Sequence, residues 1–89
     1  MGKERQRARS AGSRLLTDRL LGQLEELNLE GQGTVPDSYE PALAELRANL
    51  LGQRGVKRRL IERLQSGTST ADLIETVFTI QEIISPPVA

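Results

Sequence analysis

The chain has 89 residues and contains neither cysteine nor histidine. Without cysteine it can form no disulfide framework and no thiolate metal site, so a reducing cytoplasm is the compartment that we expect. Without histidine it lacks the commonest general base and the commonest metal ligand. Its aromatic residues are Tyr39 and Phe78. Two rings are too few for the stacking platforms that bind single-stranded nucleic acid.

The side chains that are present give little support to catalysis. Paired carboxylates, such as Asp72 with Glu75, fall on helix faces that are typical of solvent exposure. The glycines match neither a phosphate-binding loop nor a dinucleotide-binding turn. The most apolar stretch, Ser69–Ile84, spans about 16 residues and carries three acidic side chains, whereas a bilayer requires about 20 apolar residues. The sequence therefore predicts no enzyme activity, no cofactor, no metal, no small-molecule substrate and no membrane partner.

The charged residues balance in number but are arranged in blocks. Twelve basic residues oppose 12 acidic ones, for a formal net charge of zero. Residues 1–19 and 54–63 are predominantly basic, whereas residues 20–53 and the remainder after 63 are predominantly acidic. This alternation favours antiparallel neighbours, or oppositely charged surfaces on a second subunit, over uniform attraction to polyanions.

Apolar residues recur at spacings of three and four and predict helices over about 14–29, 38–65 and 69–85. Between the first two, residues 31–36 have the composition of a loop, with a hinge as the functional alternative. The middle helix contains Gly52 and Gly55, yet its apolar stripe keeps its phase through both. We therefore expect one long or kinked helix there, with two helices joined near Gly52 as the alternative.

Several residues have the pattern of helix boundaries. Asp37 with Glu40 has the form of a capping box, and Pro41 fits the first turn of the helix that follows. Gly67 suits a left-handed position after the middle helix. We expect Thr68 or Ser69 to cap the last helix, and Ser69 with Asp72 also resembles a capping pair.

Together these patterns predict an all-α fold. An antiparallel hairpin of residues 38–65 and 69–85, with the N-terminal helix packed on it, would form a small three-helix bundle. Residues 1–13 are expected to be a flexible basic tail, and residues 14–89 a single helical domain. A chain of this size covers its apolar surface poorly, so we expect an oligomer or a partner.

One segment resembles a known DNA-binding family. Leu60 to Ile74, which reads LIERLQSGTSTADLI, is similar to the helix, glycine turn and helix of LuxR-type domains. In that family a basic recognition helix follows, whereas this chain continues with Gln81-Glu82-Ile83-Ile84 and then Pro86-Pro87. The resemblance therefore implies a helical hairpin without the helix that enters the major groove.

The predicted function is protein–protein interaction, as a small adaptor, co-chaperone or regulatory subunit. Leucine and isoleucine stripes would be buried against a protein partner or a second copy. The residues predicted to contact this partner are Leu16, Leu20, Leu24, Phe78, Ile83 and Ile84.

The alternative is nucleic-acid binding through the basic segments, because arginine and lysine clusters can neutralise phosphates. A solvated helix face that pairs with acidic helices of the same protein is the competing explanation. The residues predicted for this alternative are Arg5, Arg7, Arg9, Arg54, Lys57, Arg58, Arg59 and Arg63.

Overall fold

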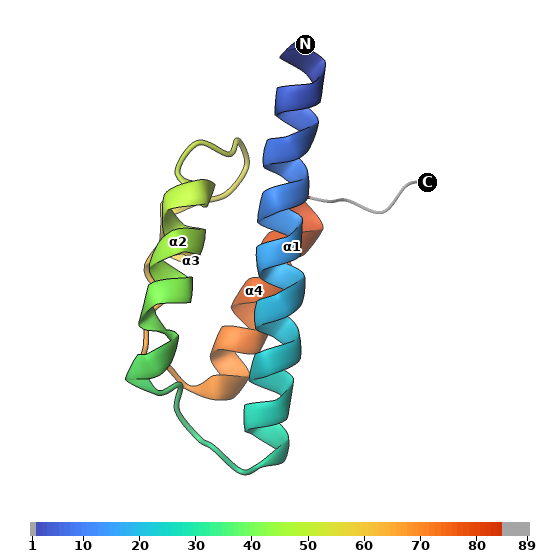
Figure 1. Cartoon of the computed structure of the whole chain (residues 1–89). Helices are drawn as coiled ribbons and strands as arrows, with labels where there is room; N and C mark the ends of the chain where they lie inside the picture. The colour runs from blue at the N-terminus through green and yellow to red at the C-terminus, as the bar shows by residue number, and fades with distance from the viewer. Residues whose placement is uncertain (1, 85–89) are drawn as a thin grey trace.

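The structure is a computed structural model that describes the backbone over residues 2–84 and the side chains over residues 14–84. Across these residues the chain is helical, which confirms the all-α prediction, and it forms no strand beyond one isolated bridge. The helical elements in chain order are α1 (Gly2–Leu29), the short 3₁₀ helix η1 (Asp37–Tyr39), α2 (Glu40–Leu50), α3 (Arg58–Glu62) and α4 (Thr70–Ile84) (Figure 1).

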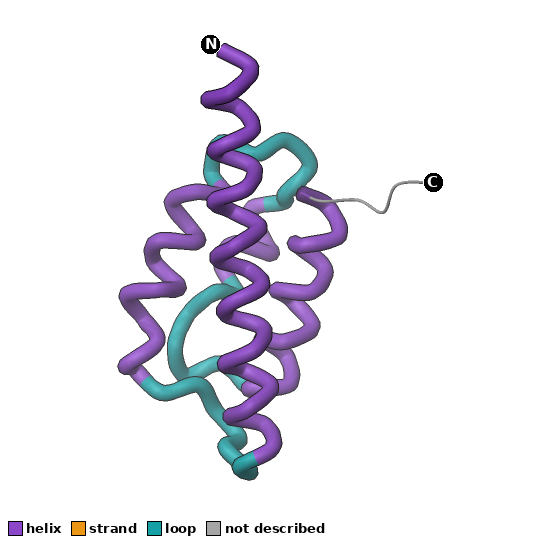
Figure 2. Tube along the Cα trace, turned by 45° about the vertical axis from the view of Figure 1, so that its right-hand side comes forward, coloured by secondary structure: helices purple, strands orange, loops and turns teal. Residues whose placement is uncertain are grey.

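The helices alternate in direction. In Figure 1, α1 descends, α2 ascends beside it, the chain descends again through α3, and α4 ascends along α1. Figure 2 shows the same arrangement from a second direction. The most extensive packing joins α1 to α4, followed by α1 to α2. The hairpin predicted between residues 38–65 and 69–85 is therefore not the principal pair, because the long apolar face of α4 lies against α1.

One apolar core holds the bundle together. Its members have exposed fractions of 9% or less and come from all four α-helices, from the first loop and from the segment between α3 and α4. Burial of each such leucine, isoleucine or valine contributes about 1.5–3 kcal/mol relative to exposure. The core residues are Leu20, Leu24, Leu27, Val35, Leu43, Leu46, Leu50, Ile61, Leu64, Leu73, Val77 and Ile80.

The first connection, residues 30–36, is a loop as predicted, and a glycine at its start terminates helix α1. Gly31 has φ of 84°, a left-handed conformation that favours glycine. Its amide donates to the Asn28 carbonyl at 3.1 Å, and the Gln32 amide donates to the Leu27 carbonyl at 3.0 Å. These two bonds form a Schellman motif, which satisfies carbonyls at the end of α1.

The first connection is also paired with the segment that precedes α4. Val35 donates to the Thr68 carbonyl at 2.9 Å and accepts from the Gly67 amide at 2.8 Å. The Thr70 amide donates to the Gly33 carbonyl at 3.0 Å. With the Val35 side chain buried at 2% exposure, these bonds fix the connection to the start of α4 and give no support to a hinge there.

The second connection, residues 51–57, corrects the prediction of one helix over 38–65. Helix α2 ends at Leu50, and α3 begins only at Arg58. Gly55 has φ of 89°, which is incompatible with a continuous right-handed helix. The prediction of one continuous helix was wrong because Ile61 and Leu64 pack in the same core as the residues of α2. The chain nevertheless runs through α3 in the opposite direction to α2.

The start of the first helix also differs from the prediction. Helix α1 begins at Gly2, whereas the apolar pattern placed the start near residue 14. Its first turns extend beyond the other helices (Figures 1 and 2). The flexibility of residues 1–13 stays a prediction. Hydrophobic periodicity missed this part of α1 because residues 2–14 contain no large apolar side chain.

The predicted helix boundaries are confirmed at Pro41 and Ser69, whereas the middle segment ends before the predicted residue 65, because α3 ends at Glu62. The Asp72 amide donates to Ser69 Oγ over 3.4 Å, so Ser69 caps α4, and Gly67 has φ of 87°. Pro41 lies in the first turn of α2. The Asp37–Glu40 capping box does not form, because the Glu40 carboxylate bonds to other partners, described below.

Candidate functional site

The residues predicted to contact a partner occupy different environments. Leu20 and Leu24 lie in the core with exposed fractions of 2% and 0%, so neither is accessible while the bundle is closed. Leu16 and Ile84 are half-buried and pack against the same core. Phe78 is exposed at 54%. Four of the six predicted contact residues therefore support the fold of this chain.

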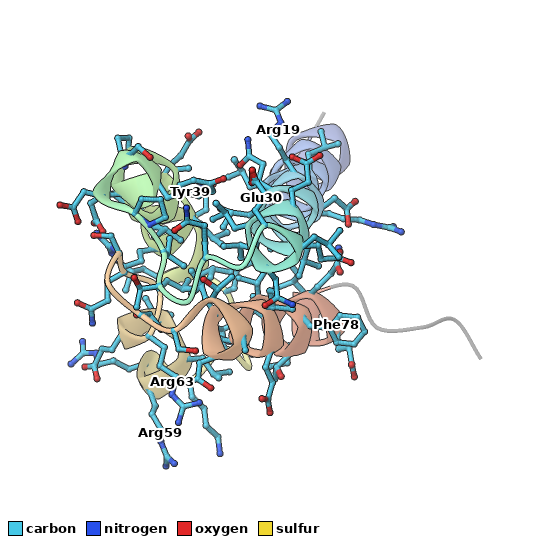
Figure 3. The ribbon with its side chains drawn as sticks, turned by 90° about the horizontal axis from the view of Figure 1, so that it is seen from below. Arg19, Glu30, Tyr39, Arg59, Arg63 and Phe78 are labelled. Carbon is cyan, nitrogen blue, oxygen red and sulfur yellow. The ribbon has the colours of Figure 1, made fainter. Side chains whose placement is uncertain are left out.

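Phe78 and Ile83, which are both predicted to contact a partner, do not share one face of α4. They are five positions apart on α4, which places their side chains about 140° apart around the helix axis. Phe78 points away from the bundle in Figure 3. Ile83 is half-buried and lies beside Gly55 of the second connection.

A groove of about 330 Å³ opens between the second connection, α3 and the C-terminal half of α4. We call it the α3–α4 groove. It combines two apolar side chains, three cations, one hydroxyl and one glycine. The lining residues are Gly55, Lys57, Arg59, Leu60, Arg63, Thr79 and Ile83.

The apolar part of the α3–α4 groove depends on the second connection. Leu60 and Ile83 are both half-buried, so each presents part of its side chain to the groove. The backbone at Gly55 approaches Ile83 closely, since a Cβ at this position would lie 3.3 Å from Ile83 Cγ2. Glycine at position 55 thus allows both the left-handed turn and the close approach to α4.

The cations of the α3–α4 groove have no acidic partner among the described side chains. Lys57, Arg59 and Arg63 are exposed, and the ion pair found in the described part of the chain joins Glu40 to Arg47 instead. Figure 3 shows Arg59 and Arg63 projecting from the same side of the bundle. Unpaired cations around an apolar floor favour a ligand that carries both negative charge and an apolar side chain.

The remaining basic residues of the predicted nucleic-acid surface lie elsewhere. Arg54 and Arg58 are exposed but do not line the groove. Arg5, Arg7 and Arg9 lie outside the described side chains. The structure thus brings together Lys57, Arg59 and Arg63 from the predicted set.

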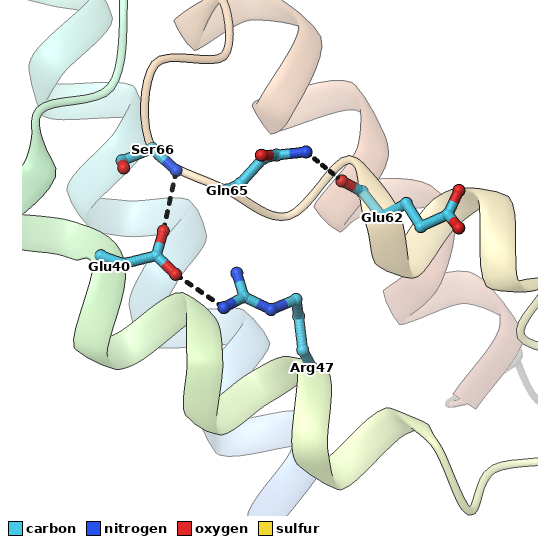
Figure 4. Close-up of a pocket in the computed structure, with 5 residues that line it drawn as sticks. All are labelled: Glu40, Arg47, Glu62, Gln65 and Ser66. Carbon is cyan, nitrogen blue, oxygen red and sulfur yellow. Dashed lines mark hydrogen bonds and ion pairs between the residues drawn. The ribbon is translucent and has the colours of Figure 1, made fainter.

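A second and larger crevice, of about 440 Å³, separates α2 from the segment after α3. Glu40 accepts from Arg47 Nη2 at 2.6 Å and from the Ser66 amide at 3.0 Å (Figure 4). Arg47 Nη1 also donates to the Leu64 carbonyl. The hydrogen bond from the Arg47 guanidinium, followed by that from the Ser66 amide, lowers the pKa of Glu40. These polar groups bond to one another, so they tie α2 to residues 64–66 and leave less for a ligand.

Over residues 14–84, no cluster of three or more acidic side chains is placed to hold a metal ion. Within residues 2–84, no helix has the length and apolarity needed to cross a bilayer. Comparisons of the chain with protein-family models, curated proteins and solved structures give no significant match.

The sequence identified the cations of the α3–α4 groove as part of a basic segment but did not predict the apolar side chains beside them. It placed Leu60 in a continuous helical core and gave Thr79 no role. The detectable signal was Gly55, because a glycine between a polar run and a basic run is also typical of a turn. A turn at Gly55 would have placed Lys57 to Arg63 on a separate short element.

Proposed function

We propose that this protein is a protein–protein interaction module that uses the α3–α4 groove as its contact surface. The observation that carries the proposal is the combination of three cations, which have no acidic partner among the described side chains, with the half-buried side chains of Leu60 and Ile83. An adaptor or a regulatory subunit is the class of protein to which such a surface belongs. The fitting ligand is a peptide segment, helical or extended, that presents an aliphatic side chain flanked by carboxylates.

Both components of the surface have a physical role in this proposal. Exposed cations steer an acidic segment and discriminate against basic ones, although each exposed ion pair adds little affinity. The apolar floor supplies the burial that holds the segment, at about 25 cal/mol for each Å² of apolar surface removed from water. Affinity should therefore need an aliphatic residue, and selectivity should need the carboxylates.

Selection from a displayed library of random short peptides tests this function. The enriched peptides should combine aliphatic and acidic residues, and their affinity should fall about tenfold with Arg63→Glu and with Ile83→Ser. Arg54→Glu is the matched control, because it reverses an exposed charge of the same basic segment outside the groove. Enriched peptides that bind all three variants equally would contradict the proposed site.

Nucleic-acid binding is the second candidate, favoured by the exposure of every basic residue between 54 and 63. Phosphate contacts make affinity fall steeply with salt and depend on charge alone. In that case Arg54→Glu and Arg63→Glu should weaken binding of a DNA or RNA duplex equally, and Ile83→Ser should leave it unchanged. Absence of binding at about 50 mM salt would exclude this candidate.

A further inference from the structure

The C-terminal end of α1 carries the most exposed large apolar side chain of the described residues. Leu29 is the last residue of α1 and is 87% exposed, compared with 9% for Leu27. Three exposed glutamates surround it, at positions 25, 26 and 30. We call Glu25, Glu26, Leu29 and Glu30 the Leu29 edge.

The Leu29 edge has the chemistry that the α3–α4 groove requires. Glu25 and Glu26 lie four and three residues before Leu29, so on a helix all three share one side. Neither these glutamates nor Glu30 has an ion-pair partner among the described side chains. The exposed Leu29 side chain and the three carboxylates thus complement the apolar side chains and the three cations of the α3–α4 groove.

The edge cannot reach the groove of its own chain. Viewed along the bundle from below, Glu30 lies on the α1 side, whereas Arg59 and Arg63 project from the opposite side beyond α3 and α4 (Figure 3). The core and α4 lie between the two surfaces. Any contact between them therefore joins two copies of the chain.

From this complementarity we infer that the occupant of the α3–α4 groove is the Leu29 edge of a second copy. The inference rests on the proposed function and names the partner of the same site. Because the two surfaces differ and lie on opposite sides, the contact is heterologous, and copies add head to tail into open chains or closed rings. This contact also gives the alternating charge blocks a role between subunits.

The contact is small, which sets its expected strength. A single leucine and a few exposed ion pairs bury far less than the roughly 1,200 Å² of a stable interface, so association is weak and visible at high protein concentration. Charge attraction between exposed groups is screened over about 8 Å at 0.15 M salt. Self-association should therefore weaken as salt is added.

Sedimentation of single variants forms the first part of the test. The unmodified chain should gain mass as its concentration rises, and Leu29→Ser should raise the dissociation constant about ten- to hundredfold. Leu51→Ser is the matched control, because Leu51 is also exposed, at 68%, but lies outside the edge. On the groove side, Arg59→Glu with Arg63→Glu should abolish association, whereas Arg54→Glu with Arg58→Glu should retain it.

Mixing two variant chains forms the second and more selective part of the test. The Leu29→Ser chain keeps an intact groove, and the Arg59→Glu/Arg63→Glu chain keeps an intact edge. Each should be monomeric alone, yet the mixture should form a heterodimer of one copy each, because only one productive contact exists between them. Circular dichroism of each variant verifies that the helices are retained.

Two results would overturn the inference: a mixture as monomeric as its components, or equal losses of association with Leu29→Ser and Leu51→Ser. A chain that stays monomeric but still selects acidic, aliphatic peptides in its groove would overturn the second copy as occupant while supporting the proposed function. A chain that neither associates nor selects such peptides contradicts both.

Discussion

The two glycine-containing connections of the bundle differ in what holds them. The first, residues 30–36, is joined by three backbone hydrogen bonds to residues 67–70 and buries Val35. The second, residues 51–57, has backbone bonds that remain local, such as Gln53 to Leu50 at 3.0 Å. Its side chain at Val56 packs against the core, and its backbone at Gly55 lies close to Ile83.

This difference separates the part of the molecule that secures the fold from the part that we propose binds a partner. Paired backbone groups and a buried valine fix the base of the bundle. Around the second connection, the charges are exposed and the apolar side chains are only half covered. Substitutions of the buried residues in the first connection should therefore chiefly change stability, whereas substitutions of the groove-lining residues beside the second should chiefly change binding.

The largest loss of stability is expected from alanine substitution of the buried valine in the first connection, compared with the valine of the second connection. Val35→Ala removes buried methyl groups and leaves a cavity, so the free energy of unfolding should fall by about 2–3 kcal/mol. Val56→Ala, at a half-buried position, should cost about 1 kcal/mol or less. Urea unfolding of both variants measures the difference. Equal losses would remove the distinction between the two connections.

Substitutions of the two glycines in the second connection should change the free energy of unfolding by smaller amounts and in opposite directions. Gly55→Ala forces an alanine into a left-handed conformation and towards Ile83, at a cost of about 1–2 kcal/mol. Gly52→Ala meets open space without a positive φ and should raise stability by about 0.4–1 kcal/mol. The thermal midpoints of the two variants should move in opposite directions. A shift in the same direction would contradict the observed turn.

Thr70 offers a way to strengthen the first connection. Its amide bonds to Gly33, but its buried hydroxyl has no hydrogen-bond partner among the described atoms. Thr70→Val replaces that hydroxyl with a methyl group and should raise the free energy of unfolding by about 1 kcal/mol. Thr76→Val is the control, because the Thr76 hydroxyl donates to the Asp72 carbonyl at 2.8 Å. Greater stabilisation by Thr76→Val would refute the assignment.

The smallest effect should be the acid sensitivity that Glu40 confers. Its pKa is lowered from 4.5 by the Arg47 guanidinium and the Ser66 amide, so its contribution is present above pH 4.5. The contribution is lost as pH falls through the lowered pKa of the folded protein. Urea midpoints at about pH 7 and about pH 3 should therefore differ less for Glu40→Gln than for the unmodified chain. Glu45→Gln, on the same helix, should retain the original pH dependence.

Local patterns in the sequence were sufficient for much of the fold. The leucine stripe of α1, the loop at Gly31 and the Ser69 cap of α4 all follow from rules that operate within a few residues. The break at Gly55 was missed because an apolar stripe that keeps its phase does not reveal a reversal of the chain. The fate of Glu40 was missed because its partners are seven and 26 residues away.

Only part of the candidate site could be predicted from these local sequence patterns. The basic segment was evident, but its apolar floor joins Leu60 to Ile83, which lie 23 residues apart. Leu20 and Leu24 were expected to contact a partner because periodicity identifies an apolar face without identifying what covers it. The structure shows that this chain covers them itself.

The most direct measurement of the central claim is a titration of the ¹⁵N-labelled chain with a synthetic peptide of residues 22–33, followed by amide chemical shifts. We expect the largest shifts at Gly55, Leu60, Thr79 and Ile83, smaller ones at the core helices, and loss of the shifts for Arg59→Glu/Arg63→Glu. A response confined to the crevice of Glu40 and Arg47 would contradict the α3–α4 groove as the binding surface, and the absence of a saturable response at any amide would contradict the Leu29 edge as its occupant.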